Sequence, residues 1–211
     1  MSVKRQIAEA LLNRLNGGII NKDSKITIRQ AMFALGEARN FVIKKHIFQA
    51  YANFGSFDVP FDLIGEYEAK VYKDSRSNWC VDLPVKALDV YKGLGIYSLY
   101  ERGFENESYV PLSANSVAMY SGLQSADTEG RKGYQPKGDK LYLKNVTFQD
   151  DTYKDVIIDM MIIPDSHSIG DREDFKLTPE MEFEVTDLAF QKLAPQVQVR
   201  QDNVHDNLEN Q

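Results

Sequence analysis

The spacing of apolar residues changes twice along this chain, and this change most constrains the fold. Over residues 2–16 and 27–53, apolar residues recur every three or four positions, as on one face of a helix. Over residues 67–164, short runs alternate apolar and polar residues between Gly, Asn, Asp, Ser and Pro clusters, which is typical of strands. From residue 178 the helical spacing returns. This order predicts an α+β fold with antiparallel sheet rather than repeated βαβ units.

Local signals place the ends of the predicted helices. Thr27 and Gln30 have the spacing of a capping box, and Gly55 follows the second helix. Thr178 is expected to cap the third helix with Pro179 in its first turn. Pro195 is expected to stop that helix, because proline cannot donate the next backbone hydrogen bond.

The predicted organisation is a single domain over residues 1–194, followed by an extended arm. Residues 1–55 form a helical hairpin, residues 56–165 a β-rich, sandwich-like core, and residues 178–194 the last helix. Residues 195–211 form the arm, since their few apolar residues are single and spaced and cannot build a core. The segment at 129–140 is expected to be an exposed turn or hairpin loop.

Composition narrows the possible partners. The chain has 211 residues and a formal net charge of −6, which suits tight binding to nucleic-acid phosphates poorly. With one cysteine, no intrachain disulfide can form. No stretch approaches the ~20 apolar residues of a membrane span, so we expect a soluble protein without a membrane partner.

The titratable residues form no recognisable metal or nucleophile pattern. The three histidines, His46, His167 and His205, lack the ligand spacing of a metal site on one element. Cys80 is expected to be a buried strand residue rather than a nucleophile, with Trp79 on the opposite face. We therefore expect no cofactor, no metal and no catalytic residue.

Three charged stretches have functional and structural interpretations. The acidic segment 165–174 could bind a cation, but its spacing does not match a calcium loop, so a solvated loop is favoured. Asp155 and Asp159 would lie ~13 Å apart on one strand face, too far for an acid–base pair. The basic residues of the predicted hairpin loop are read as a solvated tip rather than a DNA contact. They are Arg131, Lys132, Lys137 and Lys140.

Surplus aromatic residues and the polar ending indicate a protein that functions in an assembly. The second helix carries more aromatics than one core-facing stripe needs, and aromatics are enriched at interfaces. The predicted interface residues combine these aromatics with the spaced apolar residues of the C-terminal segment. They are Phe41, Phe48, Tyr51, Phe54, Trp79, Tyr97, Tyr120, Tyr134, Phe190, Val197, Val199, Val204 and Leu208.

Four stretches of the chain resemble virion proteins of crAss-like and related Bacteroidetes-infecting phages. They are "KITIRQAMFALGEARNFVIKKH", "CVDLPVKALDVYKGLGIYSLYERG", "YVPLSANSVAMYSGLQSADTEGRKGYQPKGDKLYLKNV" and "KLTPEMEFEVTDLAFQKLAPQVQVRQDNVHDNLENQ". The third stretch and the tail of the fourth are the most specific. Family members often carry Pro-Arg where this chain has Val90-Tyr91-Lys92, which puts the local turn in doubt.

The resemblance implies a structural protein of the virion neck or tail, made in the host cytoplasm. Such proteins form a cyclic homo-oligomer below the portal, expected to be a dodecamer, which contacts portal and adjacent tail ring proteins. The ring holds head to tail, and DNA passes through its channel without sequence-specific binding during genome ejection.

Other functions stay open at this point. The first alternative is an adaptor that attaches fibres or other accessory proteins to the virion, or a capsid accessory protein. A soluble host-interaction module comes next. An enzyme ranks last, because the sequence offers no nucleophile, base and orienting group in a recognisable arrangement.

Overall fold

The computed structural model describes residues 3–17, 26–55, 59–90, 95–112, 132–146, 148 and 153–198, which fall into two units. The helical unit takes the described residues of 1–63 and 166–198, and the β unit takes those of 64–165. The α+β class predicted from the apolar spacing is confirmed. Whether the two units behave as one domain stays a prediction.

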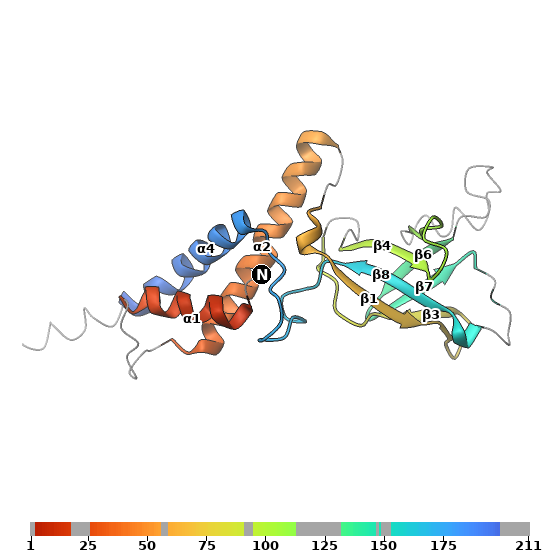
Figure 1. Ribbon diagram of the computed structural model, residues 1–211, viewed down its shortest axis with the longest axis horizontal. Coiled ribbons are helices and arrows are strands. Elements are labelled where there is room, and N and C mark those ends of the chain that lie inside the picture. Colours follow the sequence, from red (N-terminus) through yellow and green to blue (C-terminus); the bar gives the residue numbers. More distant parts are fainter. Residues whose placement is uncertain are drawn as a thin grey trace, which may run out of the picture. The chain divides into compact units, whose positions relative to one another are not determined.

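Three helices pack against one another in the helical unit (Figure 1). They are α1 (Lys4–Leu15), α2 (Ile28–Phe54) and α4 (Pro179–Gln198), and the short 3-10 helix η1 (Phe61–Leu63) follows α2. The capping box at Thr27 is confirmed: its hydroxyl accepts from the Gln30 amide, and the Gln30 side chain accepts from the Thr27 amide. Gly55 ends α2 in the left-handed conformation, with φ 66°.

The expected stop at Pro195 is wrong, because α4 continues to Gln198. A proline near a helix end removes only one hydrogen bond from the helix, since few residues follow. Packing favours the helical path: Leu193 is buried, and Val197 is half-buried beyond the proline. The extended arm therefore cannot begin before residue 199, and residues 199–211 lie outside the described residues.

The β unit consists of two sheets that share one core (Figure 1). In the three-stranded sheet the order is β1 (Gly65–Lys70), β8 (Ile157–Ile162), β4 (Ile96–Glu101). In the five-stranded sheet it is β2 (Tyr72–Lys73), β3 (Trp79–Asp82), β7 (Lys140–Lys144), β6 (Gly133–Lys137), β5 (Val110–Pro111). The pairing is antiparallel as expected, except that the short β5 pairs with β6 in parallel. The 3-10 helix η3 (Tyr153–Asp155) precedes β8.

Alternation along the strands decides which side chains enter this core. Leu141 and Leu143 of β7 are buried, whereas the residues between and beside them are half-buried on the outer face. On β8, Ile158, Met160 and Ile162 are buried in the same way. This period of two is the pattern that predicted the strands.

One expected loop is instead a strand and a tight turn. Within residues 129–140, β6 pairs with β7 along its whole length, with Tyr134 opposite Leu143. That register places Tyr134 on the inner face, where it is buried with the core residues. The polar, glycine-rich composition of this segment indicated a loop. Only two residues separate the strand from β7.

Residues 165–174 match the expected solvated loop only in part: residues 170–173 are exposed, whereas the start of the segment is buried. Ser166 and Ile169 are buried, and Asp165 is largely buried as well. The Ser166 amide donates to Asn40 Oδ1 at 3.1 Å, and the Lys4 ammonium donates to the Ser166 carbonyl at 3.0 Å. The segment from residue 166 onward is thus held by the helices of its own unit.

The close approach of Gly36 and Ser166 gives a first prediction. A Cβ at Gly36 would lie 2.9 Å from Ser166 Oγ, and that buried hydroxyl has no hydrogen-bond partner among the described residues. We expect Ser166→Ala to raise the free energy of unfolding by up to about 1 kcal/mol, because it removes an unsatisfied polar group. Gly36→Ala alone should lower it by about 1–3 kcal/mol through overpacking.

Chemical denaturation of the two single variants and the double variant tests this coupling. Gly36→Ala should cost less in the Ser166→Ala background than in the wild type, because its nearest obstacle is gone. Equal costs in both backgrounds would contradict the proposed contact.

Candidate interaction surfaces

Four phenylalanines of α2 expose their rings, although the opposite side of the helix is buried. Phe33, Phe41, Phe48 and Phe54, here called the α2 phenylalanines, are 61%, 57%, 64% and 80% exposed. Phe41 and Phe48 are seven residues apart and therefore lie on the same side of the helix. Phe183 of α4 is exposed too, which the sequence interpretation did not include. Exposed apolar groups of this kind mark interaction surfaces more often than single scattered residues do.

The remaining predicted interface residues of the helical unit are less accessible. Tyr51 and Val197 are half-buried. Phe190 is half-buried as well, and the Arg14 guanidinium of α1 lies over its ring at 4.2 Å from the centroid. Phe190 therefore contributes to packing between α1 and α4 in the chain itself.

Two predicted interface residues of the β unit belong to its interior. Tyr134 is 2% exposed, because the β6–β7 register turns it inward. Trp79 is half-buried beside the same core and meets the Phe148 ring edge-on at a centroid distance of 5.1 Å. The expectation that Tyr134 lies at an interface is wrong, because its ring is buried in the core. Trp79 is only partly buried, so its interface role stays a prediction. Tyr97 does reach solvent, at 44% exposure.

The other four predicted residues, Tyr120, Val199, Val204 and Leu208, lie outside the described residues.

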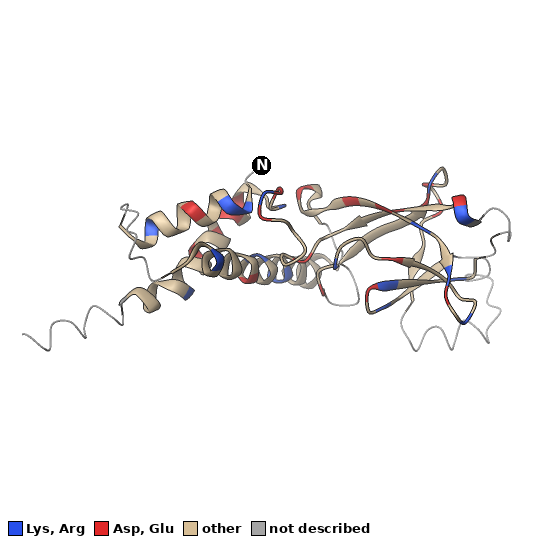
Figure 2. Ribbon diagram, turned by 90° about the horizontal axis from the view of Figure 1, so that it is seen from below, with Lys and Arg blue, Asp and Glu red and all other residues tan. Residues whose placement is uncertain are grey.

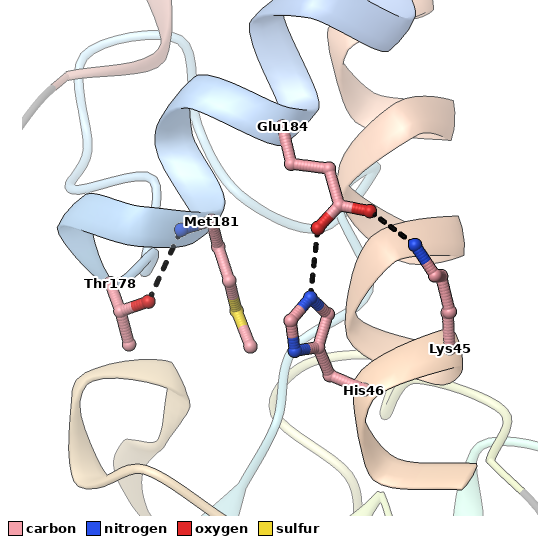
Figure 3. Close-up of polar contacts among 5 residues, drawn as sticks. All are labelled: Lys45, His46, Thr178, Met181 and Glu184. Carbon is pink, nitrogen blue, oxygen red and sulfur yellow. Dashed lines mark hydrogen bonds and ion pairs between the residues drawn. The ribbon is translucent and has the colours of Figure 1, made fainter. Parts of the chain in front are cut away.

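A shared carboxylate joins α2 to α4 (Figure 3). Glu184 accepts from Lys45 Nζ at 2.7 Å with one oxygen and meets His46 Nε2 at 2.8 Å with the other. These contacts hold the pKa of Glu184 below its usual range, the Lys45 hydrogen bond contributing most and the His46 contact next. At the start of this helix, the Thr178 hydroxyl caps α4 by accepting from the Met181 amide at 3.4 Å. His46 is thereby a structural residue of the helix pair.

A buried arginine is the main feature of the helical unit that sequence reasoning missed. Arg39 is 0% exposed, and its Nε donates to the Phe175 carbonyl at 2.8 Å. Its Nη2 donates to the Lys176 carbonyl at 3.2 Å, and the guanidinium lies near the Phe175 ring. A buried charge is tolerated only when its donors are satisfied, so this group fixes the segment before α4 onto α2.

The outer face of the three-stranded sheet carries a charged cluster rather than a carboxylate pair. Arg102 binds Asp159 through two nitrogens, at 2.7 and 3.1 Å, and also contacts Glu68. These carboxylates raise the pKa of Arg102, Asp159 first. Asp155 lies in η3 rather than on β8. The two aspartates expected to share a strand face therefore belong to different elements.

The outer face of the five-stranded sheet carries a second polar cluster, on β2, β3 and β7. The Tyr72 hydroxyl donates to Asp82 Oδ1 at 2.6 Å, and the Lys140 ammonium lies 5.1 Å from the Tyr72 ring centroid. Burial, followed by the Asp82 hydrogen bond, raises the pKa of Tyr72 to about 12. Cys80 lies on this same face, opposite Tyr72 and Tyr142, yet it is fully buried as expected, and burial raises the pKa of its thiol.

This face contains a concave region of about 610 Å³. Its lining is rich in cations: Tyr72, Lys73, Asp74, Ser75, Arg76, Asn78, Gln135, Lys137, Lys140, Tyr142 and Lys144. We call it the basic cleft. Lys137 and Lys140, predicted to form a solvated hairpin tip, thus join cations from the β2–β3 turn. Lys132 instead pairs with Glu107 at 2.9 Å and Glu101 at 3.4 Å, and Arg131 lies outside the described residues.

Within the described ranges, no three His, Cys, Asp or Glu side chains gather into a metal-binding group. The helices described there include none long and apolar enough to span a membrane. No protein-family model and no curated protein matches the chain.

The Glu184 contacts predict a pH-dependent contribution to stability. Because the folded-state pKa is lowered, the contribution exists above the unfolded-state pKa of about 4.3 and is lost as the pH falls through the folded value. We expect Glu184→Gln to be less stable than the wild type at about pH 7, by under about 1 kcal/mol because the pair is partly solvent-screened. Once the pH is well below the folded-state pKa, the difference should vanish.

Denaturant unfolding across this pH range checks the prediction. The matched control is Glu180→Gln on the exposed first turn of α4, a residue for which no ion pair occurs among the described residues. A Glu184→Gln deficit that does not change with pH, or one that the control reproduces, would contradict the assignment.

Proposed function

We propose that this chain is a structural subunit of a phage virion that forms a ring in the neck or tail below the portal. In this role it holds head to tail and lines the channel through which genome and cargo are ejected. The virion resemblance of its sequence supports the proposal, and the α2 phenylalanines are the structural observation that carries it. The ring is proposed to be twelve-fold and to contact portal and adjacent tail ring proteins.

The exposed phenylalanines favour association through the apolar area that they would bury. Burying a phenylalanine ring against a partner contributes about 1.5–3 kcal/mol, so covering several of them favours association strongly. Phe41 and Phe48 project from one side of α2 and are more than half exposed. If this side meets a different surface of the next copy, the contact is head-to-tail, and a closed ring satisfies every such contact.

Replacing two rings tests the assembly. We expect the wild-type chain, alone or with the portal protein of the same phage, to form a cyclic oligomer in native mass spectrometry. Phe41→Ser combined with Phe48→Ser should shift the mass to monomer without lowering the thermal transition, since both rings are exposed in the chain.

Phe104→Ser is the matched control, because Phe104 is 52% exposed on the β unit. It should leave the oligomer unchanged. A wild-type chain that stays monomeric in both conditions would contradict the ring and favour the adaptor alternative.

The second assembly prediction concerns residues 199–211, proposed to order on a neighbouring subunit or ring. Deleting them should weaken assembly and leave the thermal transition nearly unchanged, because α4 keeps its described length to Gln198. Val204→Ser with Leu208→Ser should reproduce the deletion, whereas Asn203→Ser with Asn207→Ser should not. Light scattering over a concentration series measures the difference, and an unaltered oligomer after deletion would refute the arm.

A further inference from the structure

The basic cleft is locally positive, although the chain as a whole is negatively charged. The chain as a whole has a formal charge of −6. Besides Lys73, the cleft lining holds four cations, Arg76, Lys137, Lys140 and Lys144, against one carboxylate, Asp74. In Figure 2, basic and acidic positions are interspersed over both units, so the excess in the cleft is local. Local clusters, rather than net charge, determine where a polyanion binds.

The register explains how these cations reach one face. On β7, Lys140, Tyr142 and Lys144 alternate with the buried Leu141 and Leu143 and therefore point outward. Lys137 of β6 is the partner of Lys140 across the hairpin. Arg76 comes from the turn that follows β2. Lys73 pairs with Trp79, and its ammonium lies over the Trp79 ring at 4.4 Å from the centroid, so it does not join this face. The outward cations are thus spread over three chain segments, the turn after β2, β6 and β7, as a multi-point electrostatic surface requires.

The one carboxylate of the lining is already engaged. Asp74 Oδ1 accepts from the backbone amides of Arg76 and Asn78 at 2.9 and 2.8 Å. These hydrogen bonds, the Asn78 amide first, lower the pKa of Asp74, although desolvation opposes them. Its role is to close the β2–β3 turn. The neighbouring Asp82 lies 3.8 Å from Lys140 and partly neutralises that cation.

Three of the cations have no such carboxylate. Arg76, Lys137 and Lys144 form no ion pair with any described residue, in contrast to Lys132, which has two. Arg76 and Lys137 are exposed, and Lys144 is half-buried. Cations that face a common cleft repel one another, so an anion that bridges them relieves this repulsion.

We infer that the basic cleft binds the phosphodiester backbone of a nucleic acid. The cleft is open and polar, with hydroxyl and amide groups of Ser75, Asn78 and Gln135 beside the cations, which suits repeated phosphate contacts rather than a small apolar ligand. Such contacts fix position and carry no sequence information, so the binding is sequence-independent. The inference does not rest on the proposed ring and can be tested on the full chain in any oligomeric state.

Fluorescence anisotropy with a labelled duplex of about 20 base pairs provides the test, with salt varied from about 50 to 200 mM. Wild type should bind and should lose affinity linearly with log salt, with a slope of up to about −3.6 for four phosphate contacts. The triple variant Arg76→Gln, Lys137→Gln and Lys144→Gln should bind at least about tenfold more weakly and show a slope smaller by about 2.7.

The matched control removes the same charge elsewhere. Arg29→Gln, Arg172→Gln and Lys192→Gln change three exposed residues of the helical unit that likewise form no ion pair among the described residues. This variant should keep both the affinity and the slope of the wild type. Far-ultraviolet circular dichroism confirms that both variants are folded.

Three results would overturn the inference. One is the absence of wild-type binding at the lowest salt, and another is equal weakening in both triple variants, which would indicate a diffuse charge effect. The third is competition by polyglutamate at least as effective as by unlabelled duplex, which would assign the cleft to an acidic protein partner. A single-stranded DNA of equal length, used as a competitor, distinguishes duplex from single-strand phosphates and supports the inference in either case.

Discussion

The helical unit depends on a charge placed where none would be expected. Arg39 is fully buried in the middle of α2, and burying an unpaired guanidinium would cost several kcal/mol. Two carbonyls of the segment before α4 accept its donors, so the segment must stay on α2 for the charge to be tolerated. Lys4 of α1 also approaches the Phe175 ring and reaches the Ser166 carbonyl. Lys4 of α1 and Arg39 of α2 therefore hold the segment before α4 in place.

Much of the architecture could be predicted from the sequence because it follows from local rules. The Thr27 capping box, the Gly55 end of α2 and the Thr178–Pro179 start of α4 are set by a few adjacent residues. The strands from β1 to β4 and the strands β7 and β8 follow from alternation. Buried Cys80 also agrees with expectation.

The errors concern positions where partners distant in sequence decide the outcome. Tyr134 became a core residue only because β6 pairs with β7, and its glycine-rich surroundings indicated a loop. The continuation of α4 through Pro195 depends on packing that no local rule reveals. The burial of Arg39 depends on carbonyls more than 130 residues away. The sequence indicated Lys137 and Lys140 of the basic cleft. It did not indicate the lining residues on β2 and the following turn, because they come from a separate part of the chain.

Cys80 has a practical consequence for studying these two units. It is the only thiol of the chain, it is completely covered in the β unit, and its Sγ lies 3.6 Å from the Tyr72 carbonyl. A thiol reagent can therefore react only after the residues of the β unit that cover Cys80 move apart. The rate of modification therefore reports the opening equilibrium of the β unit, and no engineered label is needed. Cys80 is therefore a natural probe of the dynamics of the β unit.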